Sequence, residues 1–257
     1  MLQTIPEIIA HRGYSYVAPE NTLAAINLAW LVGADAVEID IYLTTDNQIV
    51  LFHDRTTART TGVDLTVGES SFDQLRALDV GKWKGDQWAG EKIATLEDAL
   101  ATIPEGAARA SIPDRRDKRM FVEIKCHSEI VPNFLEILDA SGCKEDQVAV
   151  ICFYEDVIRD IKAALPSLEA YWLCWTDRKP TEELIEIAKS ANADGLDAMI
   201  CQAFNEDFVS KLRSAGMGVY VWTVDDDAEA LRMAALGVDG ITTNRPPEIM
   251  ALIEGRR

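Results

Sequence analysis

The sequence has few basic residues for its length. Its 257 residues include 25 Lys and Arg but 43 Asp and Glu, which gives a formal net charge of −18 and a pI near 4.5. Nucleic acids and anionic membranes bind proteins through clustered Lys and Arg. We therefore expect no nucleic acid partner and no stable membrane association. An anionic substrate would need a metal ion or a few local cations beside it.

Cysteine and long apolar runs are also scarce. The five cysteines form no CxxC pair and no zinc-type spacing, which favours buried thiols over a disulfide set. No apolar run comes near the length of about 18 residues that a transmembrane helix needs. Residues 1–7 lack the basic region followed by an apolar stretch that marks a signal peptide. These absences predict a cytoplasmic protein. The GxSxG, Walker and GxGxxG motifs of nucleophilic and nucleotide chemistry are missing too.

Short apolar segments alternate with amphipathic ones along almost the whole chain, as in βαβ units. Strands are predicted at 7–10, 36–41, 120–124, 147–151, 170–173, 195–197, 218–223 and 240–243. Helices are predicted at 22–31, 96–103, 130–140, 155–165, 181–190, 205–215, 226–236 and 246–254. Eight repeats in 257 residues predict a closed (β/α)8 TIM barrel, an α/β fold, as a single domain over residues 1–257.

Two connections stand out by length or charge. Residues 55–94 are too many for a simple loop, which predicts a small insertion between strand two and helix two that covers the active face. Residues 105–119 join a helix to the next strand at the opposite end of the barrel. We expect a solvated loop there, carrying the charges of Arg109, Arg115, Arg116, Lys118 and Arg119.

Acidic side chains come at the ends of two predicted strands. Glu38 and Asp40 are two residues apart, so both point the same way, and Glu123 reaches the same end from the next barrel strand. Three carboxylates packed together repel one another unless an oxygen-preferring cation neutralises them. The pattern predicts one divalent cation, Mg²⁺ or Ca²⁺, held by Glu38, Asp40 and Glu123.

Two basic residues lie beside this acidic cluster. Arg12 follows the first predicted strand, and Lys125 is two residues beyond Glu123 and therefore on the same face. Both would offset the charge of an anionic substrate, and Arg suits bidentate contact with phosphate oxygens. Lys125 alternatively serves only to pair with Glu123, although the two roles are compatible. We expect Arg12 and Lys125 to bind substrate.

Two of the three histidines also end apolar runs. His11 and His53 titrate near neutral pH, so one can accept a proton from a nucleophile while the other protonates a leaving alkoxide. The sequence leaves open which does which. His127 follows Cys126 at the start of a loop with no partner motif, and we expect it at the surface.

A hairpin is predicted to bring His53 back to the carboxylates. The chain alternates on both sides of Asp46 and Asn47, which favours a two-residue turn at these positions. In that register His53 faces Asp40 across the antiparallel pair. A three-residue turn would shift every facing pair and remove this inference.

Weaker signals come from residues beside these motifs. Asn21 or Thr22 precedes a helical segment and is expected first of all as an N-cap. Trp222 ends the seventh predicted strand, where it either lines the mouth and contacts substrate or packs inside the barrel.

An ordered set of short motifs runs through nearly the whole chain. They are His-Arg-Gly at 11–13, Ala-Pro-Glu-Asn-Thr at 18–22, Glu-Ile-Asp at 38–40, His-Asp at 53–54, Glu-Ile-Lys at 123–125, Trp-Thr at 222–223 and Asp-Gly-Ile-Thr-Thr-Asn at 239–244. In this order they resemble the glycerophosphodiester phosphodiesterase family. Two departures are Cys152, where that family leads us to expect Ser, and the longer basic loop before Met120.

The resemblance implies a (β/α)8 barrel with an insertion after strand two. It implies metal-dependent hydrolysis of a small-molecule glycerophosphodiester to sn-glycerol 3-phosphate and an alcohol such as choline, ethanolamine or glycerol. It also implies specific roles: metal ligands at Glu38, Asp40 and Glu123, an acid/base pair at His11 and His53, and phosphate contacts at Arg12 and Lys125.

Two other functions are open at this point. Phospholipase-D-like relatives of this barrel cleave lysophospholipid or sphingolipid headgroups, and Phe72, Trp83 and Trp88 of the insertion would supply the apolar rim such lipids need. A non-catalytic barrel that binds a phosphorylated metabolite needs cations but no acid/base pair. The presence of two histidines with three carboxylates favours the enzyme.

Overall fold

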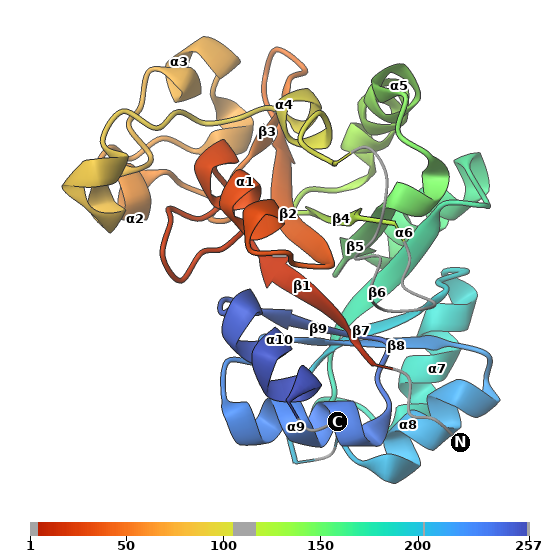
Figure 1. Ribbon diagram of the computed structural model, residues 1–257. Helices are drawn as coiled ribbons and strands as arrows, with labels where there is room; N and C mark the ends of the chain where they lie inside the picture. The colour runs from red at the N-terminus through yellow and green to blue at the C-terminus, as the bar shows by residue number, and fades with distance from the viewer. Residues whose placement is uncertain (1–4, 105–116, 203, 256–257) are drawn as a thin grey trace.

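The computed structural model describes residues 5–104, 117–202 and 204–255, and its centre is a closed barrel of parallel strands (Figure 1). The strand order is β1-β9-β8-β7-β6-β5-β4-β2, and β1 also pairs with β2, which closes the ring. The barrel strands are β1 (Glu7–His11), β2 (Ala36–Leu43), β4 (Arg119–Ile124), β5 (Val148–Cys152), β6 (Glu169–Trp175), β7 (Gly195–Met199), β8 (Gly218–Trp222) and β9 (Gly240–Thr243). The predicted TIM barrel is confirmed.

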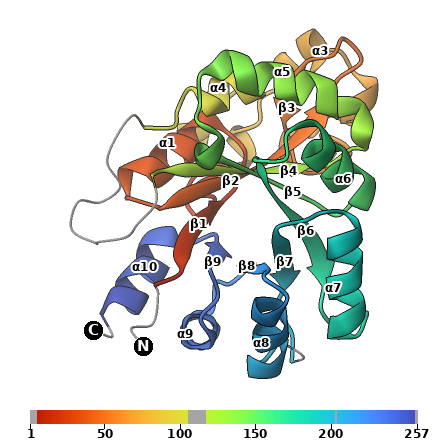
Figure 2. The same ribbon diagram turned by 90° about the vertical axis from the view of Figure 1, so that its right-hand side faces the viewer.

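Helices surround the barrel on the outside (Figures 1 and 2). They are α1 (Leu23–Leu31), α4 (Leu96–Leu100), α5 (Val131–Ser141), α6 (Glu155–Ala164), α7 (Thr181–Ser190), α8 (Glu206–Ser214), α9 (Asp227–Leu236) and α10 (Pro246–Glu254). Each buries its apolar side against the strands, which are covered on both faces and therefore read as continuous apolar runs. Within the described ranges, none of the helices is both long and apolar enough to cross a membrane.

A separate apolar cluster fills the inside of the barrel. Its members come from alternate strand positions and are Ile9, Ala36, Phe121, Ala149, Ile151, Tyr171, Leu173 and Tyr220. The rings of Tyr171 and Tyr220 lie 4.6 Å apart, and the ring of Phe121 lies 5.2 Å from that of Tyr220. Because this layer packs the barrel shut, ligands can reach polar groups only at its ends.

The hairpin after β2 has a different register from the predicted one. Strand β3 (Ile49–Leu51) pairs antiparallel with β2, with Leu43 opposite Ile49, and the Phe52 amide donates to the Asp40 carbonyl at 3.0 Å. The next pair is closed by the Thr44 amide, which donates to the Gln48 carbonyl at 2.9 Å, so the turn contains the three residues 45–47 and ends at Asn47, whose φ is +61°. The predicted pairing of His53 with Asp40 is wrong, because Phe52 occupies that place.

The predicted insertion begins after this hairpin. It contains α2 (Ala58–Thr61), α3 (Phe72–Arg76) and the short 3-10 helices η1 (Val67–Glu69), η2 (Lys82–Lys84) and η3 (Asp86–Trp88). A small core holds it to β3, made of Val50, Phe52, Val67, Leu75, Val80 and Ile93. Figure 1 shows α2 and α3 on the side of α1, and Lys84 Nζ donates to the Ser15 carbonyl at 2.6 Å. The insertion thus supports the loop that follows β1.

The basic segment before β4 differs from the expected solvated loop where it is described. Arg109, Arg115 and Arg116 lie outside the described residues. Lys118 donates to the carbonyls of Gly33 and Ala34.

Arg119, the last residue of that segment, is fully buried, which makes the expectation of a solvated charge wrong. Its guanidinium lies 2.5 Å from Glu169 and 3.7 Å from Glu7. Strand β4 begins at Arg119, and strand alternation places its side chain on the same inward face as Phe121 and Glu123.

Candidate active site

A pocket of about 110 Å³ opens at the carboxyl ends of the barrel strands. The predicted residues that line it are His11, Arg12, Glu38, His53, Glu123, Lys125 and Trp222. Asp40 lies directly beneath the surface and is fully buried. The structure therefore brings together every site residue that the sequence indicated.

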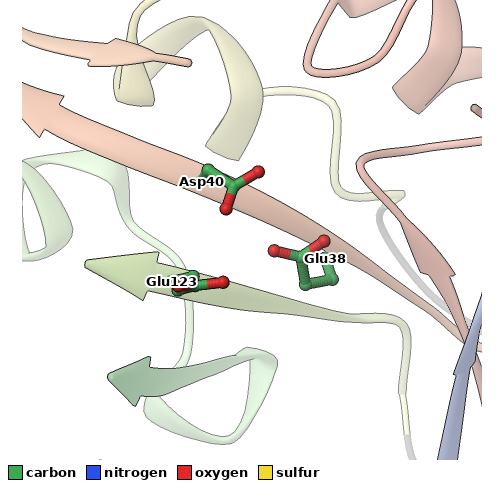
Figure 3. Close-up of side chains that lie close together, drawn as sticks. All are labelled: Glu38, Asp40 and Glu123. Carbon is green, nitrogen blue, oxygen red and sulfur yellow. The ribbon is translucent and has the colours of Figure 1, made fainter. Parts of the chain in front are cut away.

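The three carboxylates converge from two neighbouring strands. Glu38 and Asp40 project from β2 and Glu123 from β4, where Asp40 is in register with Glu123 (Figure 3). One ligand oxygen from each lies within 4.8 Å of the others, and among the described residues this is the one such cluster. Glu38 Oε1 and Asp40 Oδ1 are buried without hydrogen-bond partners in the described structure. An all-oxygen set with orphaned acceptors fits a divalent cation such as Mg²⁺ or Ca²⁺.

Their protonation reflects crowding. Burial and the neighbouring Asp40 raise the pKa of Glu38 well above its ordinary value, and they raise the pKa of Glu123 to about 7. Burial would raise the pKa of Asp40 as well, but Arg12 and Lys125 outweigh it and hold that pKa at about 2. One carboxylate is thus kept charged while two take up protons when no cation compensates them.

Arg12 is held in place by its backbone and by its side chain. Its φ of +57° turns its amide toward Glu38, where it donates to Oε2 at 2.9 Å. The guanidinium Nε lies 3.2 Å from Asp40 Oδ2, and Nη1 donates to Glu20 Oε1 at 2.9 Å. A conformation this uncommon for a residue with a side chain is typical of a site that surrounding contacts determine.

Lys125 makes the predicted ion pair and also reaches the pocket. Its Nζ lies 2.7 Å from Glu123 Oε1 and 3.4 Å from Asp40 Oδ1. Burial alone would lower the pKa of Lys125, but Asp40 and Glu123 raise it above the ordinary value. Lys125 is therefore a permanent positive charge in the wall of the pocket.

His11 is oriented by an amide. Asn244 Nδ2 donates to Asp225 Oδ2 at 2.5 Å, which turns Asn244 Oδ1 toward His11 Nδ1 at 2.8 Å. Since an amide oxygen only accepts, Nδ1 carries the proton and Nε2 has a free lone pair, 4.0 Å from Glu38 Oε2. Burial and the adjacent Arg12 lower the pKa of His11 to about 4.

His53 is oriented by a carboxylate instead. Its Nδ1 lies 2.6 Å from Asp54 Oδ1, and Asp54 Oδ2 accepts from Arg59 Nε at 2.6 Å. Burial lowers the pKa of His53, while Asp40 and Asp54 oppose that shift. The exposed His127 lies apart from the pocket, with Nδ1 3.2 Å from Asp156 Oδ2, as the sequence predicts.

Asn21 holds Asp40 in place, a role that the sequence did not predict. Thr22 is the N-cap of α1 and accepts from the Ala25 amide at 3.2 Å. Asn21, with φ +55°, instead donates from Nδ2 to Asp40 Oδ2 at 2.8 Å and accepts from the Asp40 amide at 3.0 Å. The sequence offered two signals for Asn21, its place before a helix, which a cap explains equally well, and its membership of the 18–22 motif.

Trp222 stands in the pocket wall among other aromatic rings. It meets Phe153 edge-on with ring centroids 5.7 Å apart, and Phe153 stacks on Trp175 at 4.4 Å. The Trp222 indole N–H donates to the Asp197 carbonyl at 3.0 Å. The ring thus both lines the mouth and packs within the barrel.

The fold and the pocket together define a (β/α)8-barrel hydrolase with histidines, carboxylates and cations at the carboxyl ends of its strands. A model of the family described as "Glycerophosphoryl diester phosphodiesterase family" matches residues 11–248. The chain belongs to this family, and it is an enzyme with glycerophosphodiester phosphodiesterase activity.

Similar proteins agree with this membership over nearly their whole length. A glycerophosphodiester phosphodiesterase of Caldanaerobacter subterraneus subsp. tengcongensis is 31% identical over 249 residues, which cover 96% of this chain and 97% of the relative. A phosphodiesterase of Oleispira antarctica, solved in complex with the product sn-glycerol-3-phosphate, has a TM-score of 0.85 and 28% identity. That comparison covers 97% of each chain.

Proposed function

We propose that the enzyme hydrolyses glycerophosphodiesters to sn-glycerol 3-phosphate and an alcohol, using a divalent cation and two histidines. The observation that carries this proposal is the meeting of Glu38, Asp40 and Glu123 within 4.8 Å in a pocket that His11 and His53 also line. The product bound to the Oleispira antarctica phosphodiesterase supports the same substrate class.

Glu38, Asp40 and Glu123 would hold the cation, either Mg²⁺ or Ca²⁺. When bound, the cation supplies Lewis-acid stabilisation of the charge that builds up on the phosphoryl oxygens. Arg12 and Lys125 contribute to the same stabilisation, since both are fixed by ion pairs and present positive charge to the pocket. Trp222 contributes an apolar wall for the substrate's carbon atoms.

The hydrogen-bond partners of the histidines suggest their division of labour. His11 faces an amide oxygen and keeps an unprotonated Nε2, so it takes the proton from the nucleophile, whether that is water or a substrate hydroxyl. His53 is paired with the Asp54 carboxylate, which offsets part of the fall that burial causes in the pKa of His53. It gives its proton to the departing alcohol.

We further propose that residues 1–257 act as one domain, with residues 55–94 as an insertion, in the cytoplasm. The hydrogen bond of Lys84, which links the insertion to the loop after β1, supports a single domain. None of the five cysteines forms a disulfide in the described structure, which supports a reducing compartment.

The test is release of glycerol 3-phosphate from glycerophosphocholine, with Mg²⁺ or Ca²⁺ and after chelation. Release should require the metal, and His11→Ala and His53→Ala should each lower kcat by about 10²–10⁴. Calorimetry should find metal binding retained in both variants. His127→Ala, a surface histidine outside the pocket, is the matched control and should keep full activity.

Undiminished turnover in either pocket variant, or after complete chelation, would refute the proposed chemistry. Cleavage of lysophosphatidylcholine in place of glycerophosphocholine would refute the substrate class and favour the lipid alternative.

A further inference from the structure

Strand β7 carries a carboxyl group into the active-site pocket that the chemistry above does not use. Asp197 lines the same pocket as the histidines and is only 1% exposed. Its strand neighbours in register are Leu173 and Tyr220, both in the cluster inside the barrel, so its side chain also faces inward. In the ring order, β7 is four strands from β2 in either direction. Asp197 therefore approaches the pocket from across the barrel, opposite Glu38 and Asp40.

One oxygen of this carboxyl group has no hydrogen-bond partner in the part of the chain that the structure describes. Its Oδ1 is buried without a hydrogen bond, and no described side chain forms an ion pair with it. Trp222 bonds the main-chain oxygen of Asp197 and leaves the carboxyl group unmatched. Burial raises the pKa of Asp197 to about 8. A buried polar group without a partner destabilises the fold, so a group aimed into a pocket is best explained by a partner on the ligand.

A hydroxyl group matches this carboxyl group, because a carboxyl group with a pKa of about 8 both donates and accepts hydrogen bonds at neutral pH, as a hydroxyl does. Every glycerophosphodiester has the same glycerol end, and its two hydroxyls need acceptors once they leave water. The other end varies, so the enclosed part of the pocket suits the constant half. Arg12 and Lys125 lie on the side of β1, β2 and β4, so a glycerol end that points away from a phosphate held there would reach β7.

A cationic headgroup fits this place less well. Quaternary ammonium groups are bound by open aromatic faces. Here Phe153 stacks on Trp175 at 4.4 Å, and the Arg178 guanidinium covers Trp175 at 4.0 Å. The face of Phe153 that stacks on Trp175 is therefore already in use.

We propose that Asp197 binds the glycerol hydroxyls and thereby selects glycerophosphodiesters over phosphodiesters that lack this polyol end. The inference rests on the proposed function and names a specificity-determining residue for it. Phe153, Leu173 and Trp222 supply the apolar wall against which the glycerol carbons pack.

The test compares glycerophosphocholine with propylphosphocholine, which has the same headgroup and phosphate but no free hydroxyls. In Asp197→Leu, kcat/KM for glycerophosphocholine should fall about 10- to 100-fold, while that for propylphosphocholine changes less than about threefold. Asp197→Asn retains an acceptor oxygen, so its kcat/KM for glycerophosphocholine should lie between those of the wild type and the Leu variant. An equal loss on both substrates, or no loss on either, would overturn the proposal.

Two further measurements distinguish a glycerol-binding role of Asp197 from a purely structural one, and they test that role independently of the proposed function. Because Asp197→Leu removes an unpartnered buried carboxyl, its melting temperature should equal or exceed that of the wild type. Calorimetric titration should find weaker binding of sn-glycerol 3-phosphate and unchanged binding of inorganic phosphate. If Asp197→Leu bound both ligands as the wild type does, the glycerol site would be contradicted. If the wild type cleaved neither diester, the proposed function would be refuted, but the binding measurement would still test the glycerol site.

Discussion

At the scale of single residues, the two pocket histidines show how one side-chain type acquires two characters. His11 bonds an amide oxygen of Asn244, and His53 bonds the carboxylate of Asp54. Both acceptors orient the ring and favour its charged form, but a carboxylate adds the attraction of a full negative charge, which a neutral amide oxygen lacks. The difference lies in the partner and not in the histidine.

The lowered pKa of His11, about 4 because of burial and Arg12, leads to a pH prediction. A general base works in its neutral form, which exists above its pKa, so a lowered pKa extends activity toward acid. With saturating metal, kcat/KM should show no fall on the acid side between about pH 6.5 and about pH 5, whereas His53, the general acid with a lowered pKa, sets the fall on the alkaline side. A pH profile whose acid side already falls to half at or above pH 6.5, the ordinary value for histidine, would contradict His11 as the base.

The carboxylates predict that metal binding releases protons. Glu123 has a pKa of about 7 without a cation, and that of Glu38 is also raised. Glu123 is therefore protonated to a large extent at about pH 6, and it must lose its proton to bind a metal, as must any Glu38 that the raised pKa keeps protonated. Calorimetric titrations in buffers of different ionisation enthalpy should find release near pH 6 that diminishes by about pH 9. Glu123→Gln should release less, and buffer-independent heats at pH 6 would rule the prediction out.

At the scale of elements, the β2–β3 hairpin decides how His53 enters the pocket. The three-residue turn sets Phe52 opposite Asp40, so the chain leaves the ladder before His53. Freed from the strand, His53 is oriented by Asp54, which Arg59 of the insertion holds in turn. The insertion therefore takes part in the site through this contact.

The turn itself can be tested at Asn47. Its left-handed φ of +61° costs a β-carbon-bearing residue about 1 kcal/mol, less for Asn than for Ala, and its side chain is exposed. Asn47→Ala should lower the free energy of unfolding by about 1 kcal/mol, as measured by urea denaturation. Asn47→Gly is the matched control and should cost at most a few tenths of a kcal/mol. Equal losses in both variants would mean that the backbone conformation is not the cause.

At the scale of the whole molecule, the charged groups at one end of the barrel can contact a ligand, whereas those at the other end stabilise the fold. The carboxyl end gathers groups that remain partly unpaired and can meet a ligand. At the amino end, Arg119 lies between Glu7 and Glu169, with its guanidinium 5.0 Å from the ring of Phe121. Catalytic pockets of this fold lie at the carboxyl end, so the amino-end cluster serves stability.

Replacing Arg119 should separate stability from activity. Arg119→Met keeps much of the apolar volume but removes the ion pairs of the buried guanidinium with Glu7 and Glu169, which should cost about 2–4 kcal/mol of unfolding free energy. At temperatures well below melting, kcat/KM should stay within about twofold of the wild type. Unfolding by denaturant and steady-state kinetics measure the two effects. A large loss of kcat/KM in the folded variant would show that the two ends are coupled.

The predicted barrel and most of its site depended on local rules. Apolar runs ending in Glu38, Asp40, Glu123 or His11 carry strand and strand-end signals within a few residues, and β-strand alternation relates the first two directly. The predicted register of the hairpin was wrong because one extra residue in the turn shifts every facing pair by one position. That extra residue is accommodated by the left-handed backbone at Asn47.

By itself, the sequence determined the order of strands and helices, the barrel and the identity of the groups at the ends of its strands, because these follow from short-range periodicity and residue chemistry. Only the tertiary structure decided the partners of those groups. Asn244 reaches His11 and Asp197 reaches the pocket because the barrel closes and brings strands distant in sequence to one end. Burial inside that closed ring, which no local pattern encodes, then sets their protonation.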